Sequence, residues 1–277
     1  MMGLPRIREL SLFSGIAGFT LGVKLCYPNI RTVGYVELEP YCQEVIKARI
    51  KDGFLDDAPI WDDICTFRGA EFRGLVDIIT AGVPCQWISK ASGKKPAEDH
   101  PGNLWLDTLR VIEETRPNII VLENPSNIMR YYYHVVRPRL SELGYTTKER
   151  LQAAVEVGAP HIRERFFVVA YTDNTRGTEP FLQQHIKGRI NTEPFTGRTG
   201  SLLFVPDTTD EGLEKHFNKE RLSSRQSWRQ TESPICGVDD GTAHRLDRIR
   251  ALGNAVVPAM VPEFCRKKYL NENPRPS

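Results

Sequence analysis

The pattern of apolar and polar positions predicts strands that alternate with helices over the first 171 residues. Short apolar runs typical of buried strands cover residues 8–13, 32–36, 75–81, 118–122, 153–157 and 166–170. Apolar residues recur at helical spacing over residues 19–25, 41–50 and 104–114. Such alternation is typical of a doubly wound, mainly parallel sheet, which binds ligands beyond the carboxyl ends of its strands. We therefore expect an α/β fold with a site at that edge.

The periodicity stops near residue 172. A polar stretch rich in Thr, Gly and Arg follows to about residue 241, and apolar periodicity returns from Leu246 to Tyr269. This change predicts one domain made of residues 1–171 and 245–277, with a loop-rich region at residues 172–244 between its two parts.

Composition narrows the class of protein. The formal net charge of the 277 residues is only +2, so any surface that binds nucleic acid must be a local cluster of basic residues. The six cysteines form no C-x-x-C pair and no cluster with zinc-ligand spacing, so we expect free thiols, no metal and a reducing compartment. No apolar stretch has the length of a membrane span or signal peptide, which predicts a cytoplasmic protein that does not contact a membrane.

The turn at residues 13–18, with the sequence FSGIAG, follows the first predicted strand. Its glycines let the backbone approach a ligand, and Glu37, at the end of the next strand, offers a carboxylate to ribose hydroxyls. The two features together indicate a nucleoside-containing cofactor. The turn lacks the G-x-G-x-x-G pattern, so glycines that only permit a tight turn are the alternative.

The segment GVPCQ at residues 82–86 resembles the Pro-Cys nucleophile loop of DNA cytosine-C5 methyltransferases. Further matches to this family follow in the family's order at residues 13–18, Glu37, Asp63, 122–124 (LEN), 161–165 (HIRER) and 253–258 (GNAVVP). The resemblance implies a Rossmann-like methyltransferase fold in which residues 172–244 recognise the target. It also implies methyl transfer from S-adenosylmethionine to carbon 5 of a flipped-out cytosine in duplex DNA, with S-adenosylhomocysteine as product.

The chemistry explains why these residue types are needed. Carbon 5 of cytosine is a weak nucleophile, so a thiolate must first add at carbon 6, and Cys85 is the expected nucleophile. Glu123 would protonate or hydrogen-bond ring N3, and Arg165, with Arg163 beside it, would stabilise charge at the base oxygen. Taken singly, Glu123 could instead be an acid at a helix N-terminus, and the arginines could be outward positions of an edge strand.

The resemblance also implies two further groups of residues. The expected cofactor-binding residues are Phe13, Gly15, Ile16, Gly18, Glu37, Leu38, Asp63, Ile64, Pro84, Leu104, Asn254 and Val256. The expected DNA-binding residues are Gln86, Trp87, Ser89, Lys90, Lys94, Arg225 and Arg229. Solvated basic loops are the alternative for the second group.

Two departures from the family pattern are Pro125, where valine is common, and His161, where glutamine is usual.

A tRNA cytosine-C5 methyltransferase would use the same residues, but the chain has PSN rather than Cys-Phe-Thr after the Glu-Asn turn. A catalytically silent nucleic-acid-binding relative is disfavoured because Cys85, Glu123 and Arg165 are all present. A nicotinamide-dependent dehydrogenase would leave Pro84 and Cys85 unexplained.

We expect a monomer acting on double-stranded DNA near the nucleoid of a prokaryotic or phage-infected cell, and no partner nuclease can be inferred.

Overall fold

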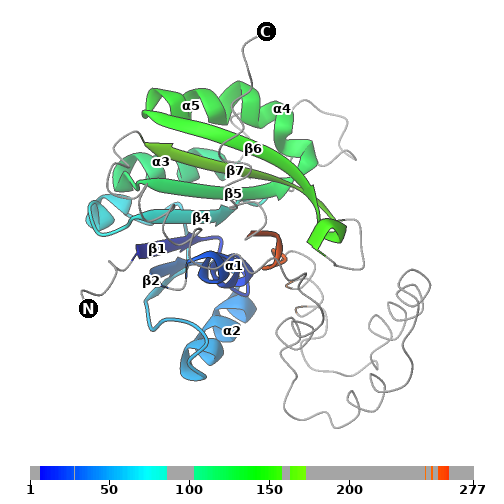
Figure 1. The fold of residues 1–277 in the computed structure, drawn as a ribbon. Coiled ribbons are helices and arrows are strands. Elements are labelled where there is room, and N and C mark those ends of the chain that lie inside the picture. The colour runs from blue at the N-terminus through cyan, green and yellow to red at the C-terminus, as the bar shows by residue number, and fades with distance from the viewer. Residues whose placement is uncertain are drawn as a thin grey trace, which may run out of the picture.

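The computed structural model describes residues 7–27, 29–85, 103–157, 163–172, 247, 251 and 255–261. Within these residues a seven-stranded sheet has the strand order β3-β2-β1-β4-β5-β7-β6 (Figure 1). The strands are β1 (Ile7–Leu12), β2 (Ile30–Val36), β3 (Ile60–Trp61), β4 (Ile78–Gly82), β5 (Ile119–Pro125), β6 (Tyr145–Ala153) and β7 (Glu164–Thr172). The α-helices are α1 (Gly18–Cys26), α2 (Pro40–Lys51), α3 (Trp105–Thr115), α4 (Met129–Tyr131) and α5 (Arg137–Glu142).

Short turns of other helical types connect some of these elements. The 3₁₀ turns are η1 (Gly69–Phe72), η4 (Ser126–Ile128) and η6 (Ala154–Val157), and η5 (Tyr132–Val136) is a π-helix between α4 and α5. No helix in the described part of the chain is long and apolar enough to cross a membrane.

The sheet is mixed, with a parallel portion and an antiparallel edge. Strands β3, β2, β1, β4 and β5 pair in parallel, whereas β7 runs antiparallel to both β5 and β6. The predicted α/β class with a mainly parallel sheet is therefore confirmed. Because β1, β2, β4 and β5 are parallel, their carboxyl ends meet at one edge, which collects the residues that follow them.

Each face of the sheet is covered by a different set of helices. Helices α3, α4 and α5 bury one face, and α1 with residues 260–261 buries the other (Figure 1). Strand β5 shows the alternation clearly, since Ile120 and Leu122 pack on the first side and Ile119 and Val121 on the second.

One predicted strand is wrong. Residues 153–157 form the end of β6 and the turn η6, and the strand itself spans Tyr145–Ala153. Strand β6 lies at the edge of the sheet and is mostly partly exposed, so polar residues occupy it and it has no apolar run. The helical segment from Met129 to Glu142 was also not predicted. The other predicted strands and helices are confirmed with small shifts of their ends, and residues 173–246 lie outside the described part.

Candidate active site

The turn after β1 is strained and tied to the end of β2. Phe13 and Ala17 have positive φ angles of 52° and 63°, which non-glycine residues seldom adopt. The backbone N–H of Gly15 donates to Oε2 of Glu37 at 2.6 Å, and the N–H of Glu39 donates to Oε1 at 2.8 Å. Burial raises the pKa of Glu37, and these N–H groups oppose the rise. The carboxylate therefore holds the two strand ends together at the predicted ribose position.

The segment at residues 255–261 returns to this turn. A Cβ on Gly18 would lie 2.6 Å from the carbonyl oxygen of Val256, so only glycine allows this approach. A Cβ on Gly82, at the end of β4, would lie 3.9 Å from Cγ2 of Val256. Nη2 of Arg163 donates to the carbonyl oxygen of Ala255 at 2.8 Å. The segment at residues 255–261 thus lies between the turn after β1 and the strands that carry the predicted catalytic residues.

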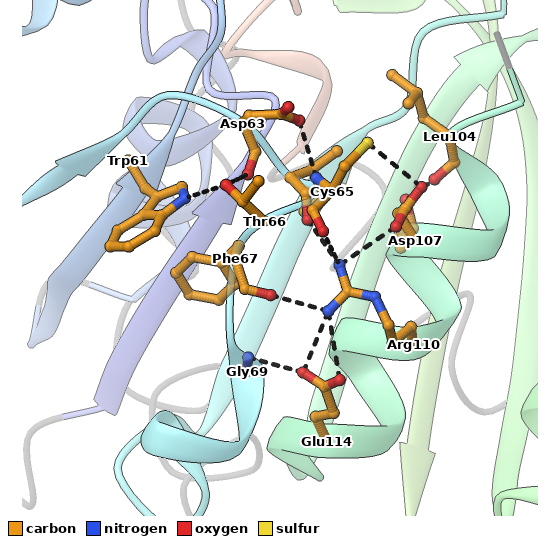
Figure 2. A network of polar contacts seen from close by, with 12 residues as sticks. Trp61, Asp63, Cys65, Thr66, Phe67, Gly69, Leu104, Asp107, Arg110 and Glu114 are labelled. Atoms are coloured by element: carbon orange, nitrogen blue, oxygen red, sulfur yellow. Dashed lines mark hydrogen bonds and ion pairs between the residues drawn. The ribbon is translucent and has the colours of Figure 1, made fainter. Parts of the chain in front are cut away.

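The loop that carries Asp63 is held against α3 by the guanidinium of Arg110, as Figure 2 shows. Arg110 donates to the carbonyl oxygens of Ile64 at 2.7 Å and Phe67 at 2.8 Å. Oδ1 of Asp63 accepts the backbone N–H of Cys65 at 2.9 Å, which closes a turn. These contacts hold two predicted cofactor residues, Asp63 and Ile64, near the start of α3. Leu104, another predicted cofactor residue, immediately precedes this helix.

Cys85 lies just beyond the end of β4 and is partly exposed. Its thiol donates to the carbonyl oxygen of Val83 at 3.3 Å, and its sulfur accepts Nδ2 of Asn124 at 2.9 Å. Burial raises the pKa of Cys85 to about 12, helped by the charge of Glu123, while the nearby indole N–H of Trp105 and the hydrogen bond from Asn124 oppose the rise. The surroundings therefore hold a protonated thiol next to donors that favour the thiolate.

Glu123 and Arg165 form a buried ion pair beside this cysteine. Nε of Arg165 lies 2.7 Å from Oε1 of Glu123, with side-chain exposures of 18% and 8%. Burial raises the pKa of Glu123, and the charges of Arg165 and Arg163 oppose the rise. In the sheet register Glu123 pairs with Gly82, so the acid and the loop of Cys85 occupy neighbouring strand ends. The arrangement combines a nucleophile, an acid with a raised pKa and a fixed cation.

Most predicted site residues are therefore described, and several come together. The predicted catalytic residues lie at the ends of β4 and β5 and the start of β7. Eight predicted site residues lie outside the described part of the chain: Gln86, Trp87, Ser89, Lys90, Lys94, Arg225, Arg229 and Asn254. Sequence reasoning missed the roles of Asn124 and Trp105, although the position of Asn124 directly after Glu123 was a usable signal.

The chain is similar to known proteins in sequence and in fold. The profile of the C-5 cytosine-specific DNA methylase family matches residues 7–250. The chain belongs to this family. Among curated proteins, the chain is 34% identical over 166 residues to the type II methyltransferase M.CviJI of Paramecium bursaria Chlorella virus IL3A, covering 59% of this chain and 42% of that protein. It is 28% identical over 175 residues to the type II methyltransferase M.HhaI of Haemophilus parahaemolyticus, covering 62% of this chain and 51% of that protein.

The chain thus spans about half the length of these curated relatives. Among solved structures, it resembles the Entamoeba histolytica methyltransferase EhMeth with a TM-score of 0.59 and 14% identity, over 97% of this chain and 100% of that one. This likeness concerns the fold, and it confirms the predicted Rossmann-like methyltransferase fold.

Proposed function

We propose that this protein transfers a methyl group from S-adenosylmethionine to carbon 5 of cytosine in double-stranded DNA, through a covalent adduct with Cys85. The observation that carries the proposal is the meeting of Cys85, Glu123 and Arg165 at neighbouring strand ends. The family membership supports the same reaction.

The residues around the turn after β1 fit a nucleoside cofactor. Leu38 has 65% of its surface exposed directly after the buried Glu37, so an apolar side chain is available beside a carboxylate. An apolar surface and an acceptor suit a purine ring and ribose hydroxyls respectively. We propose that the cofactor is held by the described residues Phe13, Gly15, Ile16, Gly18, Glu37, Leu38, Asp63, Ile64, Pro84, Leu104 and Val256. S-adenosylmethionine, when bound, supplies a methyl group on a positively charged sulfur.

Each catalytic side chain has one task in the reaction. The sulfur of Cys85 loses its proton to water and forms a bond to carbon 6, and the electron pair of the 5,6 double bond shifts to the bond between carbons 4 and 5 as negative charge builds on N3. The raised pKa of Glu123 lets it hold a proton for N3 as that charge arrives. Arg165, fixed by Glu123, donates to the base oxygen. After methyl transfer the carbon-5 proton leaves to a base, the bond from carbon 6 to sulfur breaks, and the thiolate is restored.

Arg163 has a different position from Arg165. Its donation to Ala255 supports a role in holding the C-terminal segment against the catalytic strands, in addition to the charge it contributes near Glu123.

We propose that the protein acts as a monomer in the cytoplasm of a prokaryotic or phage-infected cell. The DNA contacts proposed for the residues after Cys85 and for Arg225 and Arg229 follow from the family resemblance.

The test is methyl transfer from tritiated S-adenosylmethionine to duplex DNA. We expect labelled cytosine with the wild-type protein and none with Cys85→Ala, because alanine cannot form the adduct. Cys26→Ala, which changes a cysteine on α1, is the matched control and should retain labelling. Labelling of tRNA without labelling of DNA, or full activity of Cys85→Ala, would contradict the proposal.

A further inference from the structure

Trp105, the first residue of α3, carries a buried donor that no other group uses. Its side chain is only 1% exposed and belongs to the core cluster against which Cys85 packs. Among the described residues its indole N–H has no hydrogen-bond partner. A buried donor without an acceptor destabilises the folded protein, so its presence requires an explanation.

Hydrogen bonds and packing hold the indole of Trp105 in place. The backbone N–H of Trp105 donates to Oδ1 of Asn103 at 3.2 Å, and Nδ2 of Asn103 donates to the hydroxyl of Tyr131 at 2.8 Å. Asn103 and Tyr131 are themselves buried. The ring is therefore held by the backbone at the start of α3 and by close packing around it, and it cannot turn toward solvent.

The indole of Trp105 lies near the sulfur of Cys85, which packs against the same core cluster. The proximity of this N–H lowers the pKa of the thiol, against the dominant effect of burial. A neutral thiol is a weak acceptor, and it already accepts from Asn124 at 2.9 Å. A thiolate has a full negative charge and accepts several donors strongly. The indole N–H is thus unsatisfied while the sulfur is protonated and gains an acceptor when the sulfur ionises.

We propose that the indole N–H of Trp105 is a second hydrogen-bond donor, beside Asn124, to the thiolate of Cys85, which makes Trp105 a positioning residue for the nucleophile. The contribution of Trp105 to catalysis rests on the proposed function, whereas the effect of Trp105 on the ionisation of Cys85 does not. The pair of donors explains how a buried sulfur becomes an anion without a neighbouring histidine or lysine among the described residues.

The experiment measures the ionisation of Cys85 directly. The rate of alkylation by iodoacetamide is followed against pH, with modification at Cys85 quantified by peptide mass spectrometry, in the intact protein. Two variants remove the N–H: Trp105→Phe, and site-specific replacement of Trp105 by 3-benzothienylalanine, which keeps the bicyclic shape. Trp61→Phe is the matched control, because it removes an indole N–H that donates to Thr66 at 3.0 Å.

Both changes at position 105 should raise the pKa of Cys85 and slow its alkylation about tenfold near neutral pH. At a fixed pH well below the pKa, a pKa higher by about one lowers the thiolate fraction about tenfold. The deficit should shrink toward high pH, where the sulfur ionises in every variant. Methyl transfer to DNA should fall in parallel at neutral pH and recover in part at higher pH.

An unchanged pKa of Cys85 in the folded benzothienylalanine variant would overturn the proposal, even if Trp105→Phe fails to fold. An equal rise in Trp61→Phe would also overturn it, because the effect would then not be specific to Trp105. Failure of the wild-type protein to methylate DNA would contradict the proposed function alone, since the alkylation profile does not depend on that reaction.

Discussion

Nδ2 of Asn124 lies 2.9 Å from Sγ of Cys85, and the same nitrogen lies 2.6 Å from the carbonyl oxygen of Val83. One amide of β5 therefore fixes the loop after β4 and also donates to the nucleophile. Glu123 and Asn124 are consecutive residues of this strand. The end of β5 thus supplies both the acid and a hydrogen-bond donor to the thiol.

Replacement of Asn124 by leucine should weaken the nucleophile. The change removes a hydrogen bond that favours the thiolate, so the pKa of Cys85 should rise. Hydrogen bonds to charged groups contribute about 1.5–3 kcal/mol, which predicts a loss of methyl-transfer rate of about tenfold to a hundredfold. Single-turnover methylation measures this loss. Asn118→Leu, at the other end of the same strand region, should change it little, and equal losses in both variants would contradict a specific role.

Replacement of Arg165 by leucine should destabilise the protein in a pH-dependent way. Burial already raises the pKa of Glu123, and loss of the Arg165 charge should raise it further. The stability contribution of a group with a raised pKa is fully present below its unfolded pKa and is lost as pH rises through the folded pKa. Unfolding in urea should therefore show a small effect near pH 4 that grows toward neutral pH, to about 3–5 kcal/mol for a broken buried pair. In a Glu123→Gln background the same substitution should lose this pH dependence.

Replacement of Gly18 by alanine should separate the C-terminal segment from α1. The added Cβ would meet the carbonyl oxygen of Val256 at 2.6 Å, and backbone cannot move aside cheaply. Overpacking of this kind costs about 1–3 kcal/mol. Thermal unfolding should report the loss of stability, and calorimetry should report weaker binding of S-adenosylhomocysteine. Leu25→Ala, an exposed change on the same helix, is the control. Unaltered stability and binding in Gly18→Ala would show that the contact is unimportant.

Replacement of Gln152 by leucine should stabilise the protein. Gln152 is fully buried on β6, and neither its amide oxygen nor its amide nitrogen has a hydrogen-bond partner in the described part of the chain. A leucine of similar size removes both unsatisfied groups, which cost about 1–3 kcal/mol each. The midpoint of thermal unfolding should rise by a few degrees. Gln43→Leu is the contrasting control, because its amide donates to the carbonyl oxygen of Glu37 at 2.6 Å and the change should destabilise. A lower midpoint for Gln152→Leu would contradict the interpretation.

The amino-acid sequence alone determined where most central strands lie along the chain and identified Cys85, Glu123 and Arg165 as candidates. A continuous apolar run is a local property of the sequence, and strands buried on both faces show it strongly over residues 119–122 and 166–170. The edge strand β6 lacks this signal, so its position was misplaced by several residues.

Only the tertiary structure decided which side chains meet. The sulfur of Cys85 accepts a hydrogen bond from Asn124 of β5 and packs against the core cluster that contains Trp105 of α3, and this convergence depends on strand register and helix packing. Glu9 gives a second case, because its buried carboxyl accepts hydroxyls from Thr20, Thr32 and Thr80, on three different elements. Hydrogen-bond partners far apart in the chain leave no periodic trace in the sequence, since they are selected by how the elements pack and not by local spacing.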